Sequence, residues 1–402
     1  MFPLAERMKV VSESITLAVS AKANALKKAG VDVVGFGAGE PDFDTPAFIK
    51  EAAKAALDRG QTKYTPTPSI VELRQAIADK FNRENKLPYK PEQVTIGAGG
   101  KHCLYMAFMA VINPGDEVII PAPFWVSYPE QVKLAGGVPK IIHGSEKDGF
   151  KITPQQLESA ITAKTKVFLI NSPSNPAGHM YSPSEQKALA EVIARYPNVI
   201  VFSDEIYEKL VYDGNEFVSF ATLHPALLER TLTFNCHSKS FAMTGWRIGY
   251  AGGPKAAIDA MNKLQGQMTS HITSFIQPAG AVALNDPRGA ESIEQMRKQF
   301  EKRGRHMWER LSALPKVICV RPQGAFYCFP NVSAYFGKKA GTTQITDAVS
   351  FAAALLEQNH VAVVPGNDSG FETHVRLSFA TSMEQIDKGI DRIGEFLRKL
   401  DG

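Results

Sequence analysis

The chain has little cysteine and little imbalance of charge. Only 4 of its 402 residues are cysteine, and no two of them have the C-x-x-C spacing of a zinc or redox site. So few cysteines favour reduced thiols in a cytoplasmic protein over a disulfide scaffold. The 45 Lys and Arg side chains nearly balance the 41 Asp and Glu side chains, which leaves a net charge of +4. Such a small excess gives no argument for nucleic acid or a membrane as a partner.

Segments that would enter a membrane are also missing from the sequence. No run of about 18 apolar residues occurs, so we expect no transmembrane helix. The first fifteen residues carry charges at Glu6, Arg7, Lys9 and Glu13, and they have no apolar core of the signal-peptide type. Hydrophobic residues make up 44% of the chain and charged residues 21%. This balance is typical of a globular enzyme, and we expect a cytoplasmic one.

Short apolar runs alternate with helical patterns from about residue 44 to residue 284. Expected helices include Ala47–Leu57, Ile70–Asn82 and Ser184–Ala194. Strands that are apolar on both faces and separated by helices predict an α/β fold with a largely parallel sheet, covered on both sides. The expected strands are Val94–Ile96, Glu117–Ile120, Val138–Ile142, Lys166–Ile170, Val199–Phe202 and Leu232–Phe234.

A different pattern begins after Asn285 and predicts a second, α+β domain. Its expected elements are a long charged helix over Ser292–Leu314, a strand-rich piece over Val317–Cys328, a helix over Thr346–Gln358, strands at Val361–Val364 and Val375–Phe379, and a helix over Met383–Leu400. At about 150 residues per domain, the length allows two or three domains. We therefore expect an N-terminal arm that is part of the small domain (1–44), a large domain (45–286) and a small C-terminal domain (287–402).

A glycine-rich turn, Gly97-Ala98-Gly99-Gly100-Lys101, stands between an expected strand and a helix that begins near His102. The free N–H groups and the dipole of such a helix bind anions, although tight turns also use glycine for its conformation alone. The turn is not a Walker A loop, because Thr95 stands where the first glycine is needed and His102 where Ser or Thr is needed. Its spacing also departs from the G-x-G-x-x-G dinucleotide fingerprint.

Two further segments carry side chains suited to a cofactor. Asp204 follows the apolar run Val199–Phe202, at the strand end where parallel sheets bind ligands; a solvated loop acid and a Walker B acid are the alternatives. Lys239 stands between Ser238 and Ser240 in apolar surroundings. Such surroundings favour a neutral amine that can form a Schiff base. The alternative is a lysine whose charged end reaches solvent.

Two arginines complete the set. Arg247, in the segment Thr244–Gly249, suits a phosphate group or a surface ion pair. Arg376 lies in an apolar strand and needs a partner there, either a ligand carboxylate or an internal acid. An anion-binding turn, an acid at a strand end, a reactive lysine and these arginines together fit pyridoxal 5'-phosphate. We predict no metal site.

Longer motifs cover nearly the whole chain. They are Gly39–Pro46, Thr62–Pro66, Asn113–Val118, Trp125–Pro129, Asn171–Pro176, Ser238-Lys239, Ala242–Arg247, Val363–Gly366 and Arg376. In these motifs the chain resembles the class I aminotransferases of fold type I, and within them the bacterial-type aspartate aminotransferases. The resemblance implies a large domain with a mostly parallel seven-stranded sheet flanked by helices, together with a smaller α+β domain.

The resemblance also implies the roles of the cofactor-binding residues. Lys239 would carry pyridoxal phosphate and move the substrate proton, and Asp204 would pair with the pyridinium nitrogen. Tyr207 and Asn175 would bind the phenolic oxygen, and Trp125 would stack on the ring. The phosphate would be held by the backbone at Gly99 and Gly100, with Ser238 and Arg247, and Lys101 would belong to the same cofactor-binding set. Tyr64 would reach the phosphate of a neighbouring subunit, so the resemblance implies a homodimer.

The resemblance also implies a substrate class. Arg376, with Asn175, Trp125 and the backbone of Gly39, would hold the α-carboxylate. Ser14, Thr16 and Lys101 match the residues that bind the distal carboxylate in the subgroup, which favours aspartate and glutamate with oxaloacetate and 2-oxoglutarate. A broad-range or aromatic aminotransferase and a fold type I β-lyase stay open, because they use the same cofactor residues.

Three positions depart from the subgroup. His102 replaces a usual Gln, and Ser270-His271-Ile272 replaces a usual turn near the substrate side chain. Ser12 stands where members that accept prephenate often have a basic residue.

Overall fold

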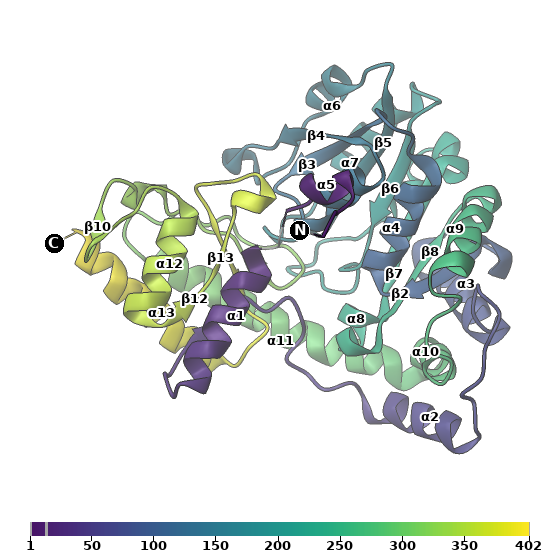
Figure 1. Ribbon diagram of the computed structural model, residues 1–402, viewed down its shortest axis with the longest axis horizontal. Helices are drawn as coiled ribbons and strands as arrows, with labels where there is room; N and C mark the ends of the chain where they lie inside the picture. The colour runs from purple at the N-terminus through teal and green to yellow at the C-terminus, as the bar shows by residue number, and fades with distance from the viewer. Residues whose placement is uncertain (1, 13–14, 402) are drawn as a thin grey trace.

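The molecule consists of two packed groups of elements, as the computed structural model of residues 2–12 and 15–401 shows. One group is a seven-stranded sheet with helices on both faces (Figure 1). The other contains α12 (Ala348–Asn359) and α13 (Met383–Asp401), with α1 (Ile15–Lys28) beside them. The long helix α11 (Pro287–Ser312) runs between the two groups.

The large sheet has the strand order β2-β8-β7-β6-β5-β3-β4, and only β8 runs against the other strands. All six strands expected from the sequence are present, with ends within two residues of those predicted, so the mostly parallel sheet is confirmed. The seventh strand, β8, was not predicted, because two glycines in its five residues weaken the apolar signal. The strands are β2 (Val94–Ala98), β3 (Glu117–Ala122), β4 (Val138–His143), β5 (Thr165–Asn171), β6 (Ile200–Asp204), β7 (Thr231–Cys236) and β8 (Ile248–Gly252).

Successive side chains of these strands pack into opposite helical layers. In β3, Val118 and Ile120 join the core beneath α4 (Gly100–Val111), α5 (Ser127–Leu134) and α9 (Lys255–Met268). Ile119 joins the opposite core, beneath α6 (Pro154–Ala160) and α7 (Pro183–Ala194). A strand covered on both faces needs apolar residues at successive positions, which explains the unbroken apolar runs. At the β2 edge, this second layer continues with α2 (Ala47–Asp58), α3 (Val71–Asn85) and α10 (Ile276–Asn285).

The second group contains three small sheets. The order β13-β14-β9 joins Val364–Pro365, Val375–Ser378 and Tyr327–Cys328, and β10 (Lys339–Ala340) pairs with β11 (Thr343–Gln344). In the third, β1 (Val34–Gly35) pairs in parallel with β12 (Val361–Ala362). The N-terminal segment therefore packs on elements from the other end of the chain.

Two expectations for this group were wrong in detail. In the expected strand-rich piece Val317–Cys328, only Tyr327–Cys328 forms a strand. Before it, Gly324 instead donates its N–H to the Gly178 carbonyl. Helix α11 begins at Pro287 rather than Ser292, because the Asp286 side chain accepts from the Arg288 N–H and proline suits the first helical turn.

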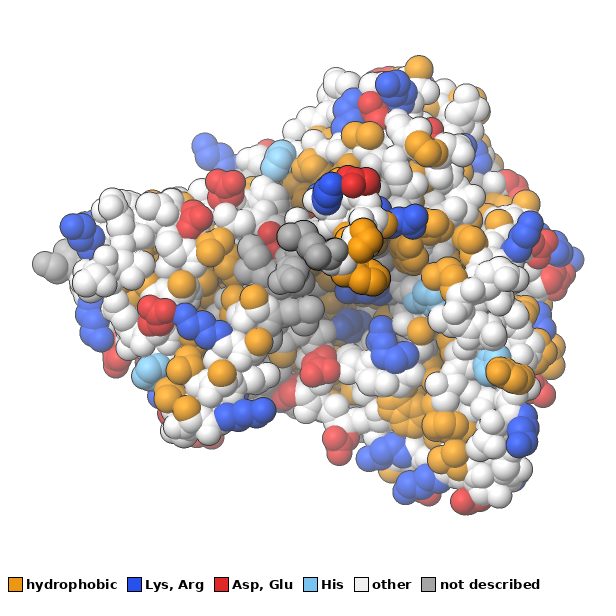
Figure 2. Space-filling view, viewed as in Figure 1, with side chains coloured by type: hydrophobic (Ala, Val, Ile, Leu, Met, Phe, Trp, Pro, Cys, Tyr) orange, Lys and Arg blue, Asp and Glu red, His pale blue; other side chains and the backbone are white. Residues whose placement is uncertain are grey.

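The surface has no large patch of one charge on the face shown in Figure 2, where Lys and Arg side chains are interspersed with Asp and Glu. Within the described residues, no helix is long and apolar enough to cross a bilayer.

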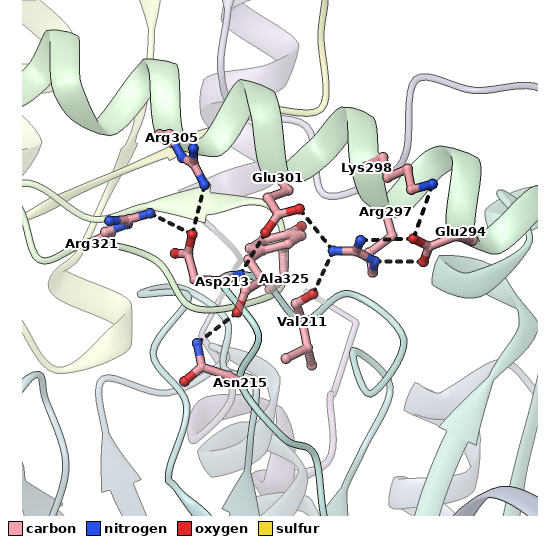
Figure 3. A network of polar contacts seen from close by, with 11 residues as sticks. Val211, Asp213, Asn215, Glu294, Arg297, Lys298, Glu301, Arg305, Arg321 and Ala325 are labelled. Atoms are coloured by element: carbon pink, nitrogen blue, oxygen red, sulfur yellow. Dashed lines mark hydrogen bonds and ion pairs between the residues drawn. The ribbon is translucent and has the colours of Figure 1, made fainter.

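A polar network fixes the loop that follows Tyr207 (Figure 3). From α11, Arg297 donates to the Val211 carbonyl at 3.2 Å, and the Glu301 carboxylate accepts from the Asp213 N–H at 2.7 Å. The Asp213 carboxylate in turn accepts from Arg305 at 3.0 Å and from Arg321 at 2.6 Å. These bonds tie the loop both to the long helix and to the segment that leads into β9.

A buried ion pair joins α3 to the start of the same loop. Lys80 and Glu208 are bonded to each other, and each side chain is only 3% exposed. Asn85 accepts from Lys80 at 2.6 Å and donates to Glu208 at 2.6 Å. A buried charge that loses its partner keeps its full desolvation cost, so this pair should matter far more than a surface pair.

We expect Lys80→Met to lower the free energy of unfolding by about 3–5 kcal/mol, because Glu208 would be left buried and uncompensated. The double variant Lys80→Met/Glu208→Leu should recover most of that loss. Lys255→Met is the matched control, since the Lys255–Asp259 pair is 58% and 56% exposed, and it should change stability by less than about 0.5 kcal/mol. Denaturant unfolding measures all three. Equal losses for the two single variants would contradict the conclusion that the buried Lys80–Glu208 pair matters more than the exposed Lys255–Asp259 pair.

Candidate active site

Two adjoining cavities lie at the carboxyl ends of the parallel strands, where β6 ends at Asp204 and β7 at Cys236. Their volumes are about 330 Å³ and 250 Å³, and both are lined by Gly39, Lys101, Trp125, Ile206 and Lys239. Sheets of this kind bind ligands at this edge. The sequence-predicted residues that line one or both cavities are Gly39, Gly100, Lys101, Trp125, Asn175, Asp204, Tyr207, Ser238, Lys239, Arg247 and Arg376.

Asp204 is a buried carboxyl, 1% exposed, at the cavity wall. The alternative of a solvated loop acid is therefore wrong. Burial raises the pKa of Asp204 to about 6, whereas hydrogen bonds from the Tyr128 hydroxyl and the Ile206 N–H, and the charge of Lys239, pull the pKa down. The Tyr128 hydroxyl donates to Asp204 Oδ2 at 2.5 Å. A carboxyl in this setting is poised to hold a cationic N–H group from a ligand.

Lys239 follows directly from β7, in the short helix α8 (His237–Ser240). Its Nζ donates to the Gly39 carbonyl and lies 6.0 Å from the Tyr207 ring centroid and 5.5 Å from that of Phe326. The amine therefore lies at the wall of both cavities, on a half-buried side chain. An amine among aromatic rings beside a cavity has the setting of a nucleophile.

The glycine turn and Arg247 form one unit. Gly99 has φ +88°, and a Cβ placed on it would lie 2.3 Å from Arg247 Nη2. Glycine therefore suits this position through its conformation, and the missing side chain leaves room for the Arg247 guanidinium. Helix α4 begins at Gly100, so its first N–H groups, which have no partner within the helix, lie next to the guanidinium. Arg247 donates to the carbonyls of Thr244 and Ala98 at 2.8 Å and 3.2 Å, and to no acid among the described residues. This arrangement suits an anion.

Arg376 is 7% exposed and has no acidic partner among the described residues. Its guanidinium donates to Asn175 Oδ1 at 3.1 Å and to the Gly37 carbonyl at 2.9 Å, while the buried Nε has no hydrogen-bond partner. The alternative of an internal acid is therefore not observed. A buried guanidinium with an unused donor at a cavity wall suits a carboxylate ligand.

Lys101 and Trp125 lie against each other at the junction of the two cavities, with Lys101 Nζ 4.9 Å from the indole ring centroid. Burial, and then the charge of Arg247, lower the pKa of Lys101 from its ordinary value. Among the described residues, Lys101 forms no ion pair with an acid, although Asp204 and Glu40 line the cavity of about 330 Å³ with it and Glu130 and Asp368 line a third cavity of about 540 Å³ with it. Lys101 is therefore available to a negatively charged ligand.

Some predicted residues lie outside this arrangement. Tyr64 is 90% exposed, lines neither cavity and packs edge-to-face on His271 with ring centroids 5.6 Å apart. Ser14 lies outside the described residues. Thr16 lies on α1, but its side chain is not among those described. Among the described residues, no group of three His, Cys, Asp or Glu side chains is placed to hold a metal ion.

Two of the three departures from the subgroup lie around the turn and a third cavity. His102 Nδ1 accepts from the Ala98 N–H at 3.0 Å, inside the glycine turn. Ser12, whose N–H donates to Glu130 at 2.8 Å, lines a cavity of about 540 Å³ next to Lys101.

Two tyrosines of the site were not predicted. Tyr128 follows Trp125 by one helical turn and holds Asp204; its position in the Trp125–Pro129 motif was the available signal. Tyr327 lies against Tyr207 and Arg376. No sequence pattern marks it, since only the pairing of β9 with β14 brings it there.

Comparisons with known proteins agree with this geometry. The family model "Aminotransferase class I and II" matches residues 31–393. The chain is 48% identical over 396 residues to an aspartate aminotransferase of Bacillus subtilis, covering 98% of this chain and 99% of that protein. It is 50% identical over 394 residues to an aspartate/prephenate aminotransferase of Cereibacter sphaeroides, covering 98% of each. The crystal structure of the aspartate aminotransferase from Rhizobium meliloti superposes with a TM-score of 0.95 at 43% identity, over the whole of both chains. The chain therefore belongs to the class I and II aminotransferases, and its fold is the one that the motifs predicted.

Proposed function

We propose that this aminotransferase uses pyridoxal 5'-phosphate and moves an amino group between aspartate or glutamate and the corresponding 2-oxo acids by a ping-pong reaction. One observation carries the proposal: a buried acid, a lysine amine, an anion cradle and a carboxylate-seeking arginine line two adjoining cavities. The names of the relatives from Bacillus subtilis, an aspartate aminotransferase, and Cereibacter sphaeroides, an aspartate/prephenate aminotransferase, support aspartate as a substrate.

The residues present fit this cofactor. Asp204 is buried, and its hydrogen bonds come from neutral groups, so it suits a pyridinium N–H. The turn at Gly99 and Gly100, with Ser238 and Arg247, suits a phosphate. When bound, pyridoxal phosphate supplies an electron sink for the carbanion formed at the substrate Cα.

The protein groups would then divide the work. Asp204 would hold a proton on the ring nitrogen, and Tyr207 and Asn175 would donate to the phenolic oxygen. Trp125 would shield the ring from water. The Lys239 amine would accept and return the proton of the substrate Cα.

Substrate recognition would use opposite ends of the cavities. Arg376 holds the α-carboxylate, with Asn175, Trp125 and the Gly39 backbone beside it. Lys101 holds the distal carboxylate, with the Ser14 and Thr16 hydroxyls as further donors. A buried cation that lacks a partner is costly, so this site disfavours apolar side chains.

We further propose a homodimer in which Tyr64 completes the phosphate site of the partner subunit. The support is that Tyr64 is 90% exposed and lines neither cavity of its own chain. The proposed domains are an arm over 1–44, a large cofactor-binding domain over 45–286 and a small domain over 287–402. All four cysteines are free thiols, which supports a reducing, cytoplasmic location.

A half-reaction screen tests the function. The purified pyridoxal form is mixed with single amino acids, and its conversion to the pyridoxamine form is followed by absorbance. Aspartate and glutamate should convert it far faster than alanine or tyrosine. Release of pyruvate and ammonia from a cysteine conjugate, without transamination, would support a β-lyase instead.

Lys239→Ala should abolish transamination but still bind pyridoxal phosphate, since the ring and phosphate contacts come from other residues. Borohydride reduction of the native protein, followed by peptide mapping, should place the cofactor on Lys239. A reduced adduct on another lysine, or normal turnover by the variant, would disprove its role.

Asp204→Asn should stabilise the cofactor-free protein, and only at higher pH. The folded-state pKa of Asp204 is about 6, above the ordinary value of 3.8, so ionisation of Asp204 destabilises the folded state. The free energy of unfolding of the wild-type protein therefore falls as the pH rises from 3.8 to about 6, whereas the neutral amide of the variant avoids that decrease. The variant should gain about 2–3 kcal/mol at pH 8 and little near pH 4 in urea unfolding. A gain that does not change with pH would contradict the pKa shift.

Lys101→Met should lower kcat/KM for aspartate by about 10- to 100-fold, the effect of losing one charge-assisted hydrogen bond. Activity toward tyrosine should change far less, and wild-type activity toward aspartate should fall at alkaline pH because the pKa of Lys101 is lowered. Steady-state kinetics with both amino acids decide the point. Equal losses for the two substrates would mean that Lys101 serves the cofactor or the fold.

A further inference from the structure

Tyr327 is a fully buried residue that contacts both Arg376, the proposed substrate-binding arginine, and Tyr207, a proposed cofactor-binding residue. In the antiparallel pair of β9 and β14, Tyr327 lies opposite Ser378. Arg376, two residues before Ser378, is therefore its diagonal neighbour on the same face of the sheet. The guanidinium carbon of Arg376 lies 4.7 Å from the centroid of the Tyr327 ring. This cation–π contact fixes the plane of the guanidinium on one side.

The hydroxyl of Tyr327 contacts Tyr207. Its hydroxyl lies 3.0 Å from the Tyr207 hydroxyl, and both rings are buried. The approach is set by the backbone, because Val211 bridges to Gly324 and the Ala325 N–H donates to the Leu210 carbonyl at 2.9 Å. The loop held by the network of Figure 3 thus runs beside the segment that carries Tyr327.

The direction of this hydroxyl contact follows from the proposed function, on which the inference rests. If Tyr207 donates its proton to the phenolic oxygen of the cofactor, its own oxygen is left to accept a proton from Tyr327. Two hydroxyls in series polarise each other, so that the second donor strengthens the first. Tyr327, Arg376 and Asp204 are charged or titratable groups that act on Tyr207, and the Lys239 amine also faces it, 6.0 Å from the Tyr207 ring centroid.

We infer that Tyr327 is a positioning residue with two separable parts: its ring orients Arg376 for the substrate carboxylate, and its hydroxyl orients Tyr207 toward the cofactor. The two parts are separable because Tyr327→Phe removes only the hydroxyl, whereas Tyr327→Leu removes the hydroxyl and the aromatic face. Tyr335→Phe is the matched control. Tyr335 is equally buried, its hydroxyl donates to the Pro315 carbonyl at 2.6 Å, and it lines neither cavity.

The experiment uses the holoenzyme without turnover. The first measurement is the pH titration of the absorbance of the bound pyridoxal group. The second is the Kd for succinate, a dicarboxylate that has no amino group to transfer. Thermal unfolding of each variant, compared with that of the control, tests whether it is folded.

The two variants should differ in one measurement and agree in the other. Tyr327→Phe should keep the succinate Kd within about twofold of wild type, since the ring remains. The pKa read from the absorbance of the bound pyridoxal group should rise by about half a unit. A weaker hydrogen bond from Tyr207 to the phenolic oxygen leaves more negative charge there, so the nearby Lys239 nitrogen holds its proton more tightly. Tyr327→Leu should show the same spectral shift and, in addition, a Kd raised by about fivefold. Tyr335→Phe should change neither.

Failure of this inference is distinct from failure of the proposed function. A wild-type protein that shows no pyridoxal titration, or binds no succinate, would overturn the function itself. If wild type shows both but Tyr327→Phe leaves the spectral pKa unchanged, the role of the hydroxyl is overturned. If a folded Tyr327→Leu binds succinate as tightly as Tyr327→Phe does, the role of the ring is overturned.

Discussion

The burial of one carboxyl group, Asp204, is the constraint on which the site depends. A carboxylate withdrawn from water is stable only if donors or a cation face it. The protein provides a hydroxyl from Tyr128 and an N–H from Ile206, but no cation at hydrogen-bond distance among the described residues. The carboxylate of Asp204 faces the cavity, where a cationic ligand group can pair with it. Asp204 thereby links the energetics of the folded chain to the charge of what it binds.

The parallel sheet explains why the other groups lie around this carboxyl. The carboxyl ends of neighbouring strands meet at one edge, so Asp204 at the end of β6 and Lys239 just after β7 come together although they are far apart in sequence. The glycine turn follows β2, which runs parallel to β7, and so it lies at the same edge. Arg247 directly precedes β8, which lies between these two strands and runs the other way, so Arg247 reaches this edge too. The second group of elements then supplies Arg376 and Tyr327 from a separate small sheet. The site thus draws residues from both groups of elements, and Tyr207 and Tyr327 pack together in one hydrophobic core.

Sequence reasoning predicted most strongly the features that depend on local pattern. Apolar runs such as Val199–Phe202 identify buried strands because both faces of the sheet are covered. The Gly99-Gly100 turn is recognisable because Gly99 adopts a positive φ, which favours glycine. The predictions were poorest where backbone geometry replaces side-chain pattern. Strand β8 contains two glycines, and the Val317–Cys328 segment is held by bonds to Gly178 and Leu210 rather than by strand pairing along its length. Tyr327 could not be assigned from sequence, since its neighbours are set by the register of β9 on β14.

The two arginines illustrate why the same residue type needs its surroundings before its role can be stated. Arg247 is exposed, and its guanidinium is held by two backbone carbonyls beside the start of a helix, so its charge adds to N–H groups that already favour an anion. Arg376 is buried, with one face against an aromatic ring and one nitrogen without a partner. A buried Nε–H without a hydrogen-bond partner destabilises the protein, and a planar carboxylate that accepts from the Arg376 guanidinium removes this cost. The first arrangement therefore suits a phosphate that stays bound, and the second suits a carboxylate that enters and leaves with each substrate.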